Sequence, residues 1–338
     1  MDTPASFATS LIVTRLTIFA KLIQFFIYLL KIRSMKRFII SLAVIICLVN
    51  IEKINAFGRR NHATIAYIAE QYLSPETRKI IQEIYDEECL MEHASFPDED
   101  RYKILVMLDD GEYIMVNGAP ILKGPDGGAF RYGAFFSTDD NGKVWTTIPH
   151  GWLADNDGNY INVDKGECIW AIKKYTQVLK NREKHTAPEV KLALQMVAHL
   201  VGDMHCPSHV HFNDMRDRDD LKYNVIYNGK EIRYHNIWDT NILVDRYIGG
   251  PIDFAYYCDP LINGSLSRRE ALRKQKEIQK GSIEDWCYDI SNRISPVFEP
   301  LPGSTITTEQ LQIFGPLGRD MVLRAGYRLA ALLNTSLR

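Results

Sequence analysis

Long apolar runs, internal repeats and low-complexity linkers are all absent from residues 57–338. Without an apolar run of about 20 residues, this part of the chain contains no transmembrane candidate. Without repeats, a stacked-repeat architecture is excluded. Without a linker, nothing divides the region into separate domains, and its length is sufficient for one substantial core.

A net positive charge is also absent from residues 57–338. Residues 57–338 carry 33 basic and 40 acidic groups, which gives a net charge of −7 with His neutral. Proteins that bind duplex DNA by charge alone usually have a basic face, so this balance argues against such a function. Bound metal cations would change the balance locally.

Cysteine occurs five times after residue 57, and no two cysteines are spaced as Cys-x-x-Cys. In an exported protein these residues could form one or two disulfides, and the odd number leaves at least one thiol free. The sequence predicts no particular pairing. The five residues are Cys89, Cys168, Cys206, Cys258 and Cys287.

Residues 35–56 have the three parts of a secretory signal peptide. Two basic residues follow Met35, an apolar run covers 38–51, and a plausible cleavage site ends at Ala56. We therefore expect translation to start at Met35 and a mature chain to begin at Phe57. We also expect export, either to a periplasm or out of the cell.

A membrane anchor is the alternative interpretation of the N-terminal region. Residues 1–34, an upstream extension, contain an apolar segment at 11–30 that is long enough to span a bilayer. Arg15 and Lys21 interrupt it, however, and a basic side chain is expensive at the bilayer centre. The run at 38–51 is short for a span, so we expect no stable membrane insertion after signal cleavage.

Apolar residues recur at helical spacing through much of the chain, which predicts a mainly α, single-domain fold over 57–338 with a few short strands and long loops. The expected helices cover 61–73, 75–88, 166–181, the stretch from Pro188 to Pro207, and 316–337. The expected hairpins cover 111–122 and 215–234, and Asn228-Gly229 forms the turn of the second. We expect a monomer.

The stretch 192–209 carries the most informative polar residues. His199 and Asp203 are four residues apart, so on a helix they project from the same face of an otherwise apolar segment. Burying such groups without partners costs several kcal/mol. A divalent metal ion is one possible partner, and a hydrogen bond within the pair is another. This stretch alone does not decide between them.

Other His and Asp residues favour the metal. His235 and Asp239 repeat the spacing of four residues, and His209 follows the first pair closely. His62 lies near the start of another expected helix. Imidazole nitrogen and carboxylate oxygen are standard zinc ligands. The further candidates in loops or short segments are Asp98 and His150.

With these residues laid out, the sequence resembles the zinc-dependent single-strand nucleases of the S1/P1 type and, more distantly, the zinc-dependent phospholipases C. The resemblance covers nearly all of 57–338. It is carried by FGRRNHATIAYIAE, ASFPDEDR, IPHGW, HLVGDMHCPSH, HNIWD and AGYRLAALLN. It implies the helical fold that phospholipase C and the single-strand nucleases share.

The resemblance also implies a cluster of three zinc ions. The implied ligands are Asp98, His150, His199 and Asp203 for one ion, His209, His235 and Asp239 for a second, and His62, Asp203 and the amine and carbonyl of Phe57 for the third. The family usually has Trp at the position of Phe57. Because the ligand atoms there are backbone atoms, the change need not affect metal binding.

The implied reaction is hydrolysis of single-stranded DNA and RNA to 5′-phosphorylated products by a zinc-activated water. Asp98 would orient this water, and Arg101 would contact the phosphate and offset its charge. Trp152 could stack on a base, although loop aromatics are more often core fillers. No protein general acid is needed if zinc stabilises the leaving oxygen.

Two departures from the family pattern concern the first histidine and the substrate cleft. Asn61 precedes His62 where the family usually has Gly, and residues 214–224 read DMRDRDDLKYN where it usually has D-x-G-G-N. The acidic cluster in this loop would repel a polyanion unless its basic residues face the cleft. The alternatives are therefore a related phosphoesterase acting on nucleotides or phospholipids, and a zinc-stabilised binding protein without catalysis.

Overall fold

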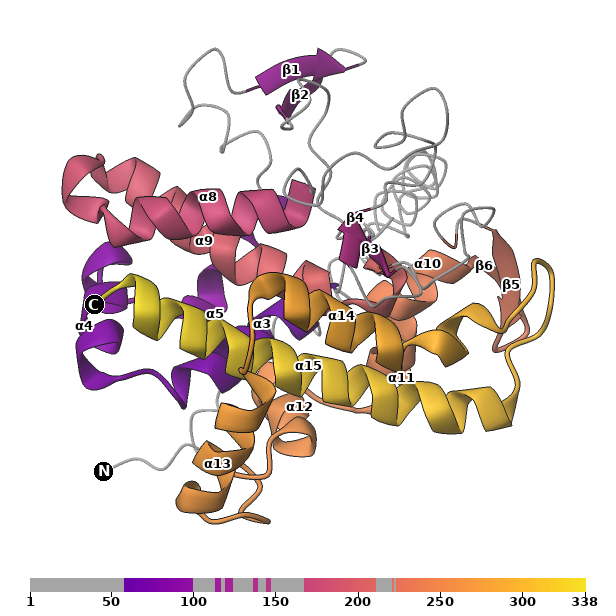
Figure 1. Cartoon of the computed structure of the whole chain (residues 1–338). Helices are drawn as coiled ribbons and strands as arrows, with labels where there is room; N and C mark the ends of the chain where they lie inside the picture. The colour runs from indigo at the N-terminus through magenta and orange to yellow at the C-terminus, as the bar shows by residue number, and fades with distance from the viewer. Residues whose placement is uncertain are drawn as a thin grey trace, which may run out of the picture. The chain divides into compact units, whose positions relative to one another are not determined.

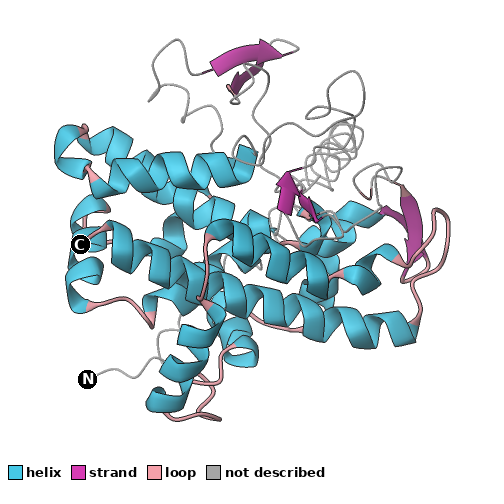
Figure 2. Ribbon diagram, viewed as in Figure 1, coloured by secondary structure: helices cyan, strands magenta, loops and turns pink. Residues whose placement is uncertain are grey.

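The computed structural model describes residues 58–99, 113–116, 119–123, 136–138, 144–146, 167–210, 221 and 223–338, all within one compact unit, Ile54–Arg338. The expected signal peptide and upstream extension lie outside the described residues. Helices dominate the described part, and its strands form three two-stranded hairpins (Figure 2), which confirms the mainly α fold. None of its helices has the length and apolarity needed to cross a bilayer.

Three helices form the centre of the unit: α3 (Gly58–Glu70), α9 (Ala187–His205) and α15 (Thr308–Ser336) pack against one another (Figure 1). From Val190 onward nearly every residue of α9 is buried. A helix that is apolar almost all round belongs inside a core. The polar groups that α9 carries are therefore placed in the interior by the hydrophobic residues around them.

The ends of α9 confirm the boundaries expected from the sequence. Thr186 and Glu189 form a capping box, in which the Glu189 carboxylate accepts from the Thr186 backbone N–H at 2.7 Å. At the other end the N–H of Cys206 donates to the Asp203 carbonyl, and Pro207 cannot continue the helix. α8 (Glu167–Lys180) agrees with the expected helix and packs along α9. The short 3-10 helix η2 (Arg182–Lys184) lies between the two in the chain.

The second helix is shorter than expected. α4 (Pro75–Ile84) begins as predicted, since the Ser74 hydroxyl accepts from the Thr77 N–H at 3.1 Å, but it ends at Ile84 rather than near residue 88. Asp86 and Glu87 have positive φ angles of 54° and 73°, a conformation that an α-helix cannot contain. The chain then forms α5 (Leu90–His93) and α6 (Phe96–Glu99).

The final helix is longer than expected. The sequence places its start at Pro316, but α15 begins at Thr308, where the Thr307 hydroxyl accepts from the Gln310 N–H at 3.2 Å. Pro316 therefore lies inside the helix and not in its first turn. Because proline has no backbone N–H, it removes one hydrogen bond of the helix there. Four further helices were not expected from the sequence: α12 (Pro251–Cys258), α13 (Arg268–Ile278), α14 (Ile283–Arg293) and η5 (Ser295–Phe298).

Two of the three hairpins were expected. In the third, Asn228 and Gly229 have φ angles of 49° and 72°, which is the positive-φ pair that a type I′ turn requires. The middle hairpin was not predicted. The antiparallel pairs are β1 (Tyr113–Val116) with β2 (Ala119–Leu122), β3 (Phe136–Thr138) with β4 (Val144–Thr146), and β5 (Asn224–Tyr227) with β6 (Lys230–Arg233).

Close contact between α3 and α15 leads to the first prediction. A β-carbon at Gly326 would lie 2.6 Å from Ile68 Cγ2 and 3.2 Å from the Ile65 carbonyl oxygen. We expect Gly326→Ala to lower the free energy of unfolding by about 1–3 kcal/mol, because backbone and a buried branched side chain must move. Urea unfolding monitored by circular dichroism measures this change.

Gly315→Ala is the matched control, because it makes the same substitution in the same helix. Its new β-carbon would meet only the exposed, flexible side chain of Arg246. Its gain in helix propensity is offset by crowding against the ring of Pro316, which follows it, so we expect a small net change, smaller than that of Gly326→Ala. Equal destabilisation by the two variants would contradict the proposed tight α3–α15 contact.

Candidate metal centre

Six of the sequence-predicted ligands come together in the described structure, although they belong to different segments. His62 lies on α3, His199 and Asp203 on α9, and His209 on the 3-10 helix η3 (Pro207–His209). The remaining two follow β6, on α10 (Tyr234–Asn236) and the π-helix η4 (Ile237–Asn241), before α11 (Ile242–Arg246); they are His235 and Asp239. π-helical turns occur often at functional sites.

Asp203 is the shared centre of the first group. Its Oδ1 lies 3.3 Å from His62 Nε2 and its Oδ2 lies 3.3 Å from His199 Nε2, and all three side chains are fully buried. His209 Nδ1 is 3.9 Å from Oδ1. One carboxylate thus faces imidazole nitrogens from three segments of the chain.

Asp239 is the centre of the second group. Its Oδ1 lies 3.5 Å from His209 Nε2, and its Oδ2 lies 3.2 Å from His235 Nε2. The rings of His209 and His235 stack with centroids 5.0 Å apart. His209 therefore faces both carboxylates through its two ring nitrogens, so the two groups form one continuous cluster.

The imidazole rings of the first group are held in fixed orientations. The rings of His62 and His199 stack at 4.1 Å, nearly parallel, and His199 Nδ1 lies 3.0 Å from the Ala94 carbonyl oxygen. A carbonyl can only accept, so Nδ1 carries the proton and donates it. His199 Nε2 is then left to face Asp203: in the neutral ring it offers the lone pair with which His binds metals, and in the protonated ring it offers positive charge to the carboxylate.

Both carboxylates keep their negative charge in the interior. Burial raises the pKa of Asp203, but the neighbouring imidazoles, His199 foremost, outweigh it and hold the pKa below its usual range. For Asp239 burial acts in the same direction, and His235 and His209 again lower the pKa overall. A buried carboxylate that stays ionised needs positive charge nearby.

The donor set fits a metal ion. Neither oxygen of Asp203 receives a hydrogen bond of acceptable geometry from any described residue, although both are buried. Ligand atoms about 2.1 Å from a tetrahedral ion lie about 3.4 Å from one another, close to the separations around Asp203 and Asp239. Two sets of described residues could hold ions, namely His62, His199 and Asp203, and Cys206, His209 and Asp239.

Cys206 and Ser208 contact Asp239, and the sequence analysis missed both. The Cys206 thiol lies 3.3 Å and the Ser208 hydroxyl 3.2 Å from Asp239 Oδ1, and both can donate to it. Burial, followed by the charge of Asp239, raises the pKa of the Cys206 thiol, which therefore keeps its proton. These donors leave Oδ2, on the side of His235, as the less occupied oxygen. Their position in the HCPSH motif, next to the expected ligand His209, is the sequence feature that could have indicated a role in the site.

Gly202 is a third residue with a role in the site that was not predicted from the sequence. A β-carbon there would lie 2.6 Å from His62 Nδ1 and 2.8 Å from His62 Cε1. The absence of a side chain on α9 therefore makes room for the His62 ring beside Asp203. The sequence feature that could have indicated this role is a glycine inside an expected helix, one residue before the candidate ligand Asp203.

Five other predicted site residues have side chains outside the described part. Asp98 lies on α6, but its side chain is outside the described part, as are Phe57, Arg101, His150 and Trp152. Residues 211–220 and 222, most of the acidic loop, are also outside it. No disulfide joins any two of the five described cysteines.

The fold and the cluster define a mainly helical protein with a buried His/Asp centre suited to metal. A family model described as S1/P1 Nuclease matches residues 57–338. The chain belongs to the S1/P1 nuclease family.

Nuclease S1 of Aspergillus oryzae is 25% identical over 294 residues, which cover 82% of this chain and 91% of that protein. Nuclease P1 of Penicillium citrinum and Nuclease PA3 of a Penicillium species are each 24% identical over 306 residues, 82% of this chain and 97% of each relative.

The contact between Gly202 and His62 leads to the second prediction. We expect Gly202→Ala to displace the His62 ring and weaken binding of divalent metal by about tenfold or more, as loss of an orienting contact typically does. Metal titration by calorimetry measures the affinity. In a His62→Ala background Gly202→Ala should have little further effect. Additive losses in the double variant would show that Gly202 acts through something other than His62.

The donors to Asp239 lead to the third prediction. Removing the donor in Cys206→Ala should weaken metal binding by roughly tenfold, whereas Cys206→Ser keeps a donor and should lose less. Cys287→Ala, which removes a buried thiol that contacts Met204, is the control. Equal metal affinity in Cys206→Ala and Cys287→Ala would exclude an orienting role.

Proposed function

We propose that this member of the S1/P1 nuclease family is an exported, zinc-dependent phosphodiesterase that hydrolyses single-stranded DNA and RNA to 5′-phosphorylated products. The buried Asp203 carboxylate, faced by imidazoles from three segments, is the observation that carries the proposal. Membership of a nuclease family over 57–338 supports phosphodiesters as the substrate class. The features of 35–56 support export, and we propose that the mature protein is a monomer.

Three zinc ions are proposed, with ligands assigned residue by residue. The six described ligands support the parts of the three sets to which they belong, because their nitrogen and oxygen atoms already face one another. The remaining ligands rest on the resemblance alone. They are Asp98 and His150 for the first ion, and the amine and carbonyl of Phe57 for the third.

Zinc bound there would supply Lewis-acid chemistry: it polarises phosphoryl oxygens and makes a water nucleophilic near neutral pH. The chain's own residues would position the reactants. Asp98 would accept a hydrogen bond from the attacking water and so orient it, and Arg101 would donate to the phosphate oxygens and offset their charge. Asp203 would hold two ions at a fixed separation.

A substrate panel tests the proposed function. Turnover of a single-stranded oligonucleotide, its blunt duplex, a 3′-nucleotide and phosphatidylcholine should be compared, each with and without EDTA. We expect the single strand to be cut fastest, because the cluster needs direct access to the phosphate and the chain has no net positive charge to hold a duplex. Turnover of the lipid alone would mean a phospholipase. No turnover despite bound zinc would mean a binding protein.

The fourth prediction concerns the two carboxylate-centred groups. Asp203→Ala should remove more zinc than His235→Ala, because Asp203 would serve two ions and His235 only one. Elemental analysis of the purified variants gives the zinc content per chain, and circular dichroism controls for folding. The same zinc loss in both variants would be incompatible with a bridging role for Asp203.

The fifth prediction links export to chemistry. Phe57 can offer zinc an amine only after the bond to Ala56 is cut, because an amide lone pair is delocalised into the peptide bond. One Met added before Phe57 should therefore remove the third zinc and most of the activity, and leave the fold intact. Zinc content and turnover of the correctly cut and Met-extended proteins are the measurements. Three zincs and full activity in the extended protein would falsify the N-terminal chelate.

A further inference from the structure

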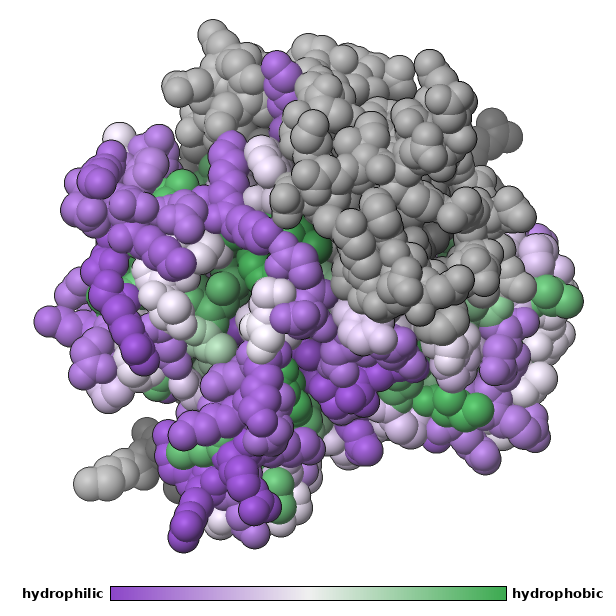
Figure 3. Space-filling model, viewed as in Figure 1, coloured by the Kyte–Doolittle hydropathy of each residue, from purple (hydrophilic) through white to green (hydrophobic). Residues whose placement is uncertain are grey.

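Helix α13 has an excess of positive charge in a chain that is otherwise acidic. Residues 268–280 contain six Lys/Arg and two Glu, whereas residues 57–338 as a whole have a net charge of −7. The helix packs on α15, and its charged side chains are exposed. The surface there is strongly hydrophilic (Figure 3).

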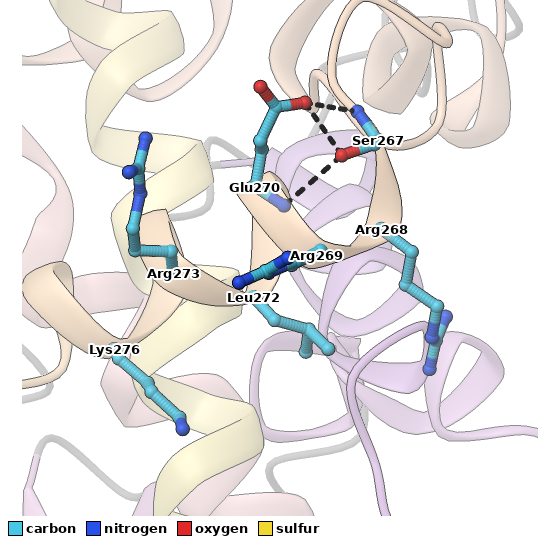
Figure 4. Close-up of a pocket in the computed structure, with 7 residues that line it drawn as sticks. All are labelled: Ser267, Arg268, Arg269, Glu270, Leu272, Arg273 and Lys276. Atoms are coloured by element: carbon cyan, nitrogen blue, oxygen red, sulfur yellow. Dashed lines mark hydrogen bonds between the residues drawn. The ribbon is translucent and has the colours of Figure 1, made fainter.

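The two acidic residues of this segment are already engaged. Glu270 accepts from the backbone N–H and hydroxyl of Ser267 in a capping box, which turns its carboxylate toward the start of the helix (Figure 4). Glu277 pairs with Lys280 at 2.7 Å. The other five cations make no ion pair with any described residue; they are Arg268, Arg269, Arg273, Lys274 and Lys276.

A pocket of about 250 Å³ lies where α12, α13 and α15 meet, and Lys274 and Arg319 both line it. Its one carboxylate, Asp320, is paired with Arg324 at 2.7 Å and faces Arg293 at 3.8 Å. Arg319 makes no ion pair with described residues. The pocket therefore offers two uncompensated cations to a ligand.

One aromatic side chain lines the same pocket. Tyr257, which lines it, is 44% exposed, and the adjacent Tyr256 is 55% exposed. Exposed aromatic rings beside cations are the combination by which proteins hold single-stranded nucleic acid, because cations bind phosphates and any base can stack on a ring. A simple phosphate or a membrane surface would use the cations but would gain little from the tyrosines.

Four of the exposed cations, Arg268, Arg269, Arg273 and Lys276, line a separate pocket. We propose that the pocket between α12, α13 and α15 forms a second binding site for single-stranded nucleic acid, outside the metal centre, with Lys274 and Arg319 as its cations and Tyr257 as the stacking residue. It holds the phosphodiester backbone of a strand whose cleavage occurs at the metal centre. The proposal rests on the proposed nuclease function, because it takes the substrate class from there.

The test compares long and short substrates in the full mature protein with its metal. A Lys274→Gln/Arg319→Gln variant and the wild type are assayed on a dinucleotide and on a single strand of about 30 nucleotides over a range of salt concentrations. We expect the variant to raise the KM for the long strand and to lower the log–log salt slope by about 1.4, the value for two phosphate contacts on a single strand. Dinucleotide kinetics should not change. Tyr257→Ala should raise the KM for the long strand without changing the salt slope.

Lys79→Gln/Lys184→Gln is the matched control, since it removes the same charge from exposed positions on α4 and η2. An equal effect of this control would overturn the site in favour of net charge alone. An unchanged salt slope in the Lys274→Gln/Arg319→Gln variant would also overturn the site. If that variant instead loses binding to anionic lipid vesicles, the pocket binds a membrane surface and not a nucleic acid strand. If the wild type cuts neither substrate, the proposed function itself fails, and this outcome is distinct from the others.

Discussion

The rest of the site depends on one buried negative charge, the carboxylate of Asp203. Placing an ionised carboxylate in a core costs several kcal/mol unless positive charge and good geometry compensate. Here the compensation comes from segments far apart in sequence, because His62, His199 and His209 all face the same two oxygens. Close packing of α3, α9 and α15 is what allows these segments to meet, and Gly202 supplies the space that the His62 ring occupies.

The two halves of the cluster differ in how they meet solvent. The side chains of His62, His199 and Asp203 are fully buried, whereas His235 is 23% exposed. Among the six described ligands, His235 is the most exposed, so the Asp239 half of the cluster lies nearer the surface of the described part. The π-helical turn carries Asp239 there, and the Cys206 and Ser208 donors hold its carboxylate in place. The core thus encloses the Asp203 half, and the Asp239 half lies closer to its edge.

The sequence was most informative where spacing alone determines geometry. Pairs four residues apart must share a helix face, so the spacing was enough to pair His199 with Asp203 and His235 with Asp239. Helix ends were less predictable, because they depend on local choices: Pro316 looked like a first turn, yet the cap at Thr307 starts α15 earlier. Contacts such as Gly202 with His62 depend on how two helices pack, which no local pattern encodes. The resemblance, not spacing, supplied Phe57 and Arg101 and assigned Asp98 and His150 to a particular ion.

The residue before the first histidine shows how a departure from the family pattern can be accommodated. Where the resemblance leads one to expect Gly, this chain has Asn61, which is almost fully buried. Its side-chain amide donates to the Asp239 backbone carbonyl at 3.4 Å. That long bond links α3, which carries His62, to the π-helical turn that carries Asp239. A metal-ligand side chain must point a nitrogen or oxygen atom at the ion. A residue such as Asn61, which joins two ligand-bearing segments, needs only a hydrogen-bond donor that reaches a backbone carbonyl. The ligand positions are therefore tightly constrained, and the residues that support them can differ between relatives.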